Sequence, residues 1–113
     1  MKKEKFVAAH KLGRKQYAVV HIGYKKVIDD MEFFIYKDKD QWFAVHGDSG
    51  QSICKSKTIK GTVKLLEEKV ERNGLMKFLR SKFMESVIED FQDVTVIAEQ
   101  KWNWMNECEK EIA

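Results

Sequence analysis

The chain has no proline among its 113 residues, and it contains no Gly-rich, Ser-rich, repeated or low-complexity segment. These absences exclude flexible linkers and repeat arrays, and the length suits one compact domain spanning residues 1–113. Apolar runs are also short, about four residues at most, whereas a membrane-spanning helix needs roughly 18 to 20. We therefore expect a single domain and no membrane partner.

Cysteine is scarce as well. Cys54 and Cys108 lie far apart in the chain and do not form a CxxC pair, so we expect two half-buried thiols in a reducing compartment. The first lysines precede an apolar stretch of only residues 6–9, which is too short for the core of a signal peptide. A cytoplasmic location follows as the prediction.

The six glycines are scattered singly, so the sequence offers no phosphate-binding glycine loop of a dehydrogenase or P-loop NTPase. One short run, GDSG at residues 47–50, matches the surroundings of the nucleophile in chymotrypsin-like serine proteases. Those enzymes read GDSGG, because the second glycine helps to form the oxyanion hole, whereas Gln51 follows here. Gly, Asp and Ser between two alternating runs are typical of a turn. We predict a turn, no catalytic residue and no enzyme.

Histidines are few, and they carry no metal-ligand spacing. His10, His21 and His46 fall on predicted strands and would form a zinc site with Cys54 only if their faces converged. Neither an HxH nor a CxxC pair is present, and single strand histidines usually take packing roles. We predict no metal and no other cofactor.

The net charge of +3 is unevenly distributed. Residues 1–60 hold 13 Lys plus Arg against 7 Asp plus Glu, a net +6, whereas residues 61–113 hold 8 against 11, a net −3. A basic first half suits contact with a polyanion.

The first half of the sequence alternates apolar and polar residues between turn formers, and the second half shows helical spacing. The fold class that follows is α+β, with an antiparallel four- to five-stranded meander in the N-terminal half packed by two or three C-terminal helices. The expected strands cover residues 5–11, 16–24, 31–37, 41–46 and 51–56, and the expected helices cover residues 62–72 and 75–91.

Residues 93–113 allow two interpretations. Asp93 is a suitable N-cap for a helix that begins there. Alternatively, residues 94–98 (VTVIA) are β-branched enough for a short strand, with the helix starting near Glu99. The strand is the preferred alternative.

Cations and aromatic residues alternate along the predicted sheet, a combination that binds single-stranded nucleic acid by phosphate neutralisation and base stacking. The predicted nucleic-acid contacts are Lys11, Arg14, Lys15, Tyr17, Tyr24, Lys25 and Lys26. Further lysines follow near Trp42, at positions 37, 39, 55, 57 and 60. The leading hypothesis is a non-enzymatic module that engages nucleic acid or a nucleoprotein complex.

The alternative hypothesis is protein binding. Trp102, Trp104 and Met105 are concentrated near the C-terminus, and such residues are enriched at interface cores. Two tryptophans two positions apart do not share one helical face, so one is expected to contact a protein partner or a second copy in a homodimer.

In its order of elements, the segment WFAVHGDSGQSICKSKTIKGTVKLLEEKV resembles the three-strand-plus-helix DNA-binding modules of phage integrases, and the whole layout resembles small sheet modules that bind single-stranded DNA. In its short, Lys-rich, motif-free composition the chain also resembles accessory proteins of phages and plasmids, including inhibitors of host defence such as anti-CRISPR proteins. These resemblances imply DNA binding in the first case and inhibition of a protein target in the second.

Overall fold

The computed structural model describes residues 2–12, 15–72 and 74–92 together with Thr95, Ala98 and Trp102; for Lys11, Leu12, Lys15, Gln16 and Arg72 it describes the backbone only. Five strands come first, β1 (Lys2–Leu12), β2 (Lys15–Ile28), β3 (Met31–Asp38), β4 (Gln41–His46) and β5 (Ser52–Ser56). The helices α1 (Ile59–Arg72) and α2 (Leu75–Leu79) follow, and residues 82–92 are also helical. Within the described part of the chain, no helix combines the length and the apolar character needed to cross a membrane.

The strands form one antiparallel sheet in the order β1-β2-β3-β4-β5, so the predicted α+β meander is confirmed. Tight turns set the register. Asp29 and Asp30 both have positive φ, 49° and 65°, as a two-residue type I′ hairpin turn requires. Lys39 also has a positive φ in the turn between β3 and β4.

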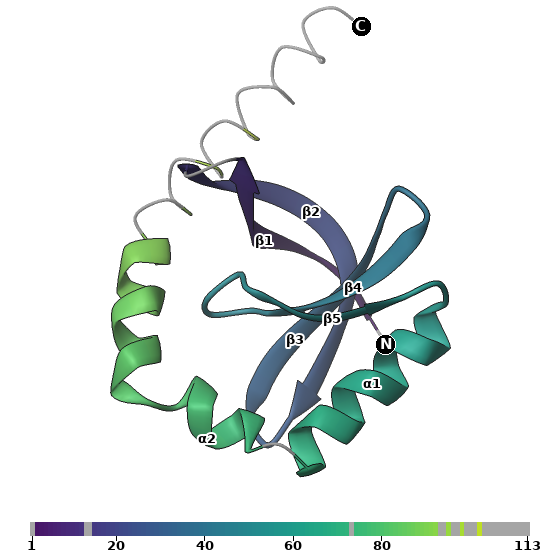
Figure 1. Ribbon diagram of the computed structural model, residues 1–113. Helices are drawn as coiled ribbons and strands as arrows, with labels where there is room; N and C mark the ends of the chain where they lie inside the picture. The colour runs from purple at the N-terminus through teal and green to yellow at the C-terminus, as the bar shows by residue number, and fades with distance from the viewer. Residues whose placement is uncertain are drawn as a thin grey trace, which may run out of the picture.

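β2 is longer than predicted because the Asp29–Asp30 turn keeps the chain extended to Ile28. Its first part pairs with β1 and its last part with β3, and Figure 1 shows that β2 curves strongly between them. Gly23 lies in close contact with β3, since a Cβ there would stand 2.7 Å from the Ile35 carbonyl oxygen. The β1–β2 hairpin therefore bends away from β3–β5.

Each side of the sheet has its own core. Phe33, Ile35 and Ala44 point toward the helices and are fully buried with Leu66 of α1. The other side is covered by β1, whose Phe6 ring stacks on Phe34 with 4.8 Å between ring centroids. Because both sides are covered, the middle strands β3 and β4 form the centre of the molecule.

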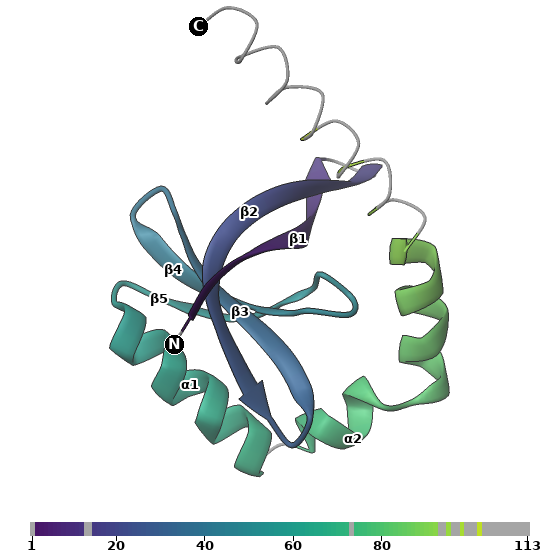
Figure 2. The same ribbon diagram turned by 180° about the vertical axis from the view of Figure 1, so that it is seen from behind.

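The helices form an arc on one side of the sheet, as Figures 1 and 2 show from opposite directions. α1 is attached to β4 by Thr62, whose buried hydroxyl donates a hydrogen bond to the Trp42 carbonyl oxygen at 3.0 Å. Leu66, one turn later, completes the core beneath it.

The predicted single helix over residues 75–91 is wrong, because the chain breaks at Arg80 and Ser81. Ser81 begins the next helix as a cap: its hydroxyl oxygen accepts a hydrogen bond from the Met84 N–H, and its carbonyl oxygen accepts one from the Glu85 N–H. The predicted strand over residues 94–98 is also wrong, since Thr95 and Ala98 are helical. The helical alternative describes both positions correctly.

Candidate binding surfaces

An open groove separates the start of β5 from α2 and the helical residues 82–92. Its volume is about 490 Å³, and its lining is mostly apolar. The lining residues are Ala9, Tyr17, Gln51, Ser52, Ile53, Leu75, Phe78, Leu79, Phe83, Met84, Val87, Asp90 and Phe91. A concave apolar surface with a few polar groups is the usual form of a binding site.

Two phenylalanines in the groove are largely exposed to solvent. Phe78 leaves 52% of its surface exposed and Phe83 leaves 68%. The two rings stand 6.2 Å apart, centroid to centroid, on either side of the break at residues 80–81. Exposed aromatic rings that border an apolar groove are typical of an interaction surface.

Contacts at both ends attach the helical wall of the groove to the sheet. The Arg80 guanidinium donates a hydrogen bond to the Asp29 carbonyl oxygen at 2.8 Å and so attaches the break to the β2–β3 turn. At the other end Phe91 is buried against Val7 and Val20 of the β1–β2 hairpin. A Cβ at Gly50 would overlap the Phe91 ring, so the glycine allows this helix to approach the β4–β5 loop.

Part of the β5 edge beside the groove is blocked to the addition of another strand. The Lys69 ammonium donates a hydrogen bond to the Ile53 carbonyl oxygen at 2.9 Å. The pairing of β4 with β5 is also irregular between Ala44 and Val45. A lysine and a bulge are common ways to protect an edge strand, so the groove offers side-chain contacts rather than a sheet edge.

The predicted nucleic-acid contacts differ in how exposed they are and in which side of the sheet they face. Tyr17 is 44% exposed and lines the groove, whereas Tyr24 is half-buried and packs against the core. Lys25 and Lys26 are neighbours within β2, so their side chains point to opposite sides of the sheet. The side chains of Lys11 and Lys15, and all of Arg14, lie outside the described residues.

Both described lysines of that set have carboxylate partners. The Lys25 ammonium lies 2.7 Å from Glu32 and 3.4 Å from Glu4, and the Lys26 ammonium lies 3.3 Å from Glu67. The hydrogen bond to Glu32 raises the pKa of Lys25. These charges join β1, β2, β3 and α1, which gives them a structural role.

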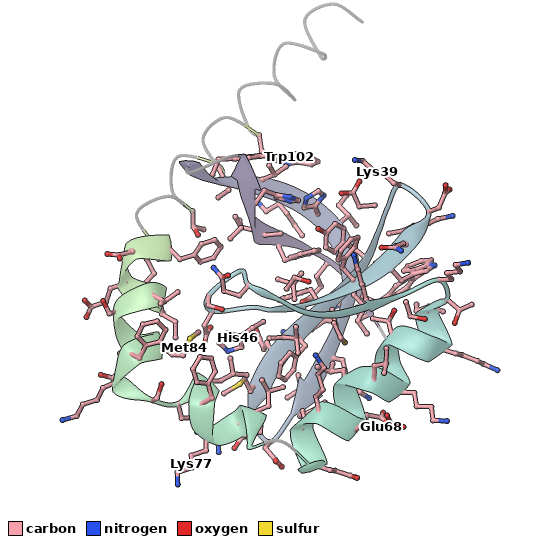
Figure 3. All side chains as sticks on the ribbon, in the orientation of Figure 1. Lys39, His46, Glu68, Lys77, Met84 and Trp102 are labelled. Atoms are coloured by element: carbon pink, nitrogen blue, oxygen red, sulfur yellow. The ribbon has the colours of Figure 1, made fainter. Side chains whose placement is uncertain are left out.

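Trp102, predicted at a protein interface, is half-buried and packs against the Val7, Val20 and Phe91 cluster. Figure 3 shows it beside the end of the β1–β2 hairpin. Trp104 and Met105 lie outside the described residues. The groove was missed by sequence reasoning, since it is formed by segments far apart in the chain.

The GDSG run forms the predicted turn between β4 and β5. His46 Nδ1 and the Ser49 hydroxyl oxygen are 2.7 Å apart, and both side chains are fully buried. The other ring nitrogen, Nε2, has no hydrogen-bond partner among the described residues, and burial lowers the pKa of His46. A serine with no access to solvent cannot meet a substrate. The Ser49–His46 hydrogen bond therefore has a structural role in the β4–β5 loop, and we call it the latch.

His10 and His21 lie in contact across β1 and β2, with their Nε2 atoms 3.0 Å apart. Burial lowers the pKa of His21, with a smaller contribution from His10. His46 and Cys54 are not joined to this pair, and no group of three or more metal-ligating side chains occurs among the described residues. The hydrogen bond requires one nitrogen to donate and the other to accept, so the two histidines pair with each other.

Comparison with known proteins gives no match, whether with protein-family models, with curated proteins or with solved structures. The likeness to phage integrase modules is therefore one of element order alone.

Proposed function

We propose that the protein is a non-enzymatic binding module that holds an apolar segment of a protein partner in the groove. The single observation that carries this proposal is the exposed pair Phe78 and Phe83, which leave 52% and 68% of their surfaces in solvent beside an apolar hollow of about 490 Å³.

Energetics support a protein partner. Burial of a phenylalanine side chain contributes about 1.5–3 kcal/mol, so covering two half-exposed rings contributes on the order of 2–3 kcal/mol before other contacts are counted. The rest of the groove lining adds further apolar area, including Leu75, Val87 and Ile53. A few such rings usually supply most of the affinity of an interface.

The groove also has a polar border that can orient a partner. Asp90 lines it, and the exposed Glu89 lies next to it on the same helix. A partner with a basic residue next to its apolar side chains would match this edge. A module of this kind acts by occupying its partner, so we propose an inhibitor or regulator that works in the cytoplasm.

The experiment compares three forms of the tagged protein as bait: the native sequence, Phe83→Glu and Leu65→Glu. Leu65 is a matched control because it is an exposed leucine, 38% in solvent, on α1 outside the groove. We expect Phe83→Glu to lose a partner that the native protein and Leu65→Glu both retain. Light scattering after size exclusion reports whether that partner is a second copy of the chain.

Thermal melts provide the stability control. Substitutions at exposed positions usually change stability by about 0.5 kcal/mol or less, so both variants should melt close to the native protein. Equal retention by all three baits would contradict the proposal.

A further inference from the structure

A separate surface of the molecule collects positive charge at the end of the sheet where β3, β4 and β5 meet the start of α1. Its residues are called the lysine end here: Lys37, Lys39, Lys55, Lys57 and Lys60. All five are exposed. Figure 3 shows Lys39 at the tip of the β3–β4 hairpin and Lys77 of α2 on the opposite side of the molecule.

Strand register brings these lysines together although they are spread over 24 positions of the sequence, from 37 to 60. Lys37 pairs with Trp42, and Trp42 pairs with Ser56. Adjacent strands are about 4.8 Å apart, so the backbones of Lys37 and Ser56 lie roughly 10 Å apart across β4. Lys55 and Lys57 flank Ser56, and Lys55 pairs with Phe43, so its side chain points to the side of the sheet away from the helices, whereas Lys37 points to the same side as Trp42. The Thr62–Trp42 hydrogen bond holds the first turn of α1 beside this end of the sheet.

The charge of this surface is not neutralised by ion pairs among the described residues. Lys25 and Lys26 each reach a glutamate, but none of the five lysines of the lysine end has a carboxylate in ion-pair contact within that part of the chain. Asp38 and Asp40 in the β3–β4 turn are the acidic residues next to it. Five cations against two carboxylates leave a net positive surface.

α1 adds to this excess at its N-terminus. Its first turn contains no acidic residue, and Lys60 occupies a position where a cation is unfavourable because the helix dipole is positive there. The capping Thr58 hydroxyl accepts the Gly61 N–H at 3.0 Å. A bound anion would reduce the repulsion among these like charges.

We propose that the lysine end binds the phosphate backbone of nucleic acid, independently of the groove. The lysines come from five segments and do not converge on one point, which suits a polymer with repeated charges better than a small anion. Trp42 is half-buried and packs against the core, so the surface offers charge without an exposed stacking ring. Binding is therefore electrostatic and insensitive to base sequence.

The test is fluorescence anisotropy with labelled DNA and RNA of about 20 nucleotides, single-stranded and duplex, over a range of salt concentrations. Lys55→Glu/Lys57→Glu is compared with the matched control Lys77→Glu/Lys82→Glu, which lies on the groove side. Each double variant changes the net charge from +3 to −1. We expect the first variant to weaken binding about tenfold or more and to reduce the log–log salt slope by about 2, since two phosphate contacts are lost.

Three results would overturn this proposal. One is absence of binding by the native protein at about 50 mM salt. Another is an equal loss in both double variants, which would mean that net charge alone governs binding. The third is a loss confined to Lys11→Glu/Lys15→Glu, which would locate the site at the β1–β2 hairpin. Melting curves check folding, and Lys37→Ala/Lys39→Ala repeats the test if Lys55→Glu/Lys57→Glu melts early.

Discussion

At the scale of single residues, two buried polar side chains show how the β4–β5 connection is held in place. Ser49 and His46 are fully buried and bonded to each other inside a loop whose sequence matches a protease motif. The Ser49 hydroxyl also accepts the Gln51 N–H at 3.3 Å, so it joins the two ends of the turn. The residues that suggest catalysis in the sequence thus hold the β4–β5 connection in place.

Replacing Ser49 by alanine tests this latch. Both ring nitrogens of His46 would then be buried without partners, and an unsatisfied buried polar group costs about 1–3 kcal/mol. We expect Ser49→Ala to lower the free energy of unfolding by that amount in urea titrations. Ser52→Ala, at an exposed serine of the same hairpin, should change it little, and equal stability of the two variants would argue against the latch.

Stability should also depend on pH through two histidines. Burial lowers the pKa of both His46 and His21 in the folded protein, whereas an unfolded histidine titrates near 6.5. Below about pH 6.5 the unfolded chain therefore binds more protons than the folded one, and stability falls as the pH decreases toward the lowered values. A urea midpoint lower at roughly pH 5.5 than at pH 7.5 is the expected result; an unchanged midpoint would contradict it.

At the scale of elements, local patterns predicted the sheet well and the helices less well. The strand over residues 41–46 was predicted with the observed bounds, because alternation and flanking turn residues define it. The break at Arg80 and Ser81 was missed, since Phe78 and Phe83 fit an uninterrupted apolar face as a pattern. Only the attachment of Arg80 to the Asp29 carbonyl and the Ser81 cap reveal that the chain turns there.

The binding surfaces were harder to predict than the strands. Lys25 and Lys26 are neighbours in β2, but a strand points successive side chains to opposite sides, which separates the two predicted contacts. The groove depends on Tyr17, Ile53 and Phe83 coming together, and their separation in sequence hides this contact. Exposed aromatic side chains can be recognised only once burial is known.

α1 provides a prediction at this scale. Leu66 is fully buried in the main core, whereas its neighbour Leu65 is 38% exposed. Truncation of a buried leucine to alanine costs about 2–5 kcal/mol, so Leu66→Ala should destabilise the protein by that amount. Leu65→Ala should cost about 0.5 kcal/mol or less. Similar losses in chemical denaturation would mean that α1 packs on the sheet through a different face.

At the scale of the whole molecule, two surfaces of different character lie at opposite ends of one small sheet. The groove near α2 is apolar with exposed rings, and the lysine end near the start of α1 is charged. The pair would let the protein contact a protein and a nucleic acid together, as a regulator of a nucleoprotein complex would need to do. Each surface can be removed without the other, since Phe83 and Lys55 belong to separate elements.

Site-specific photo-crosslinking in cells that make this chain tests directly whether the groove binds a protein. A photoreactive phenylalanine analogue replaces Phe83 in one form and the exposed Leu65 of α1 in another. We expect one discrete adduct from position 83, lost when Phe78→Glu is added, and none of that mass from position 65. Absence of an adduct at position 83, or the same adduct from both positions, would contradict it.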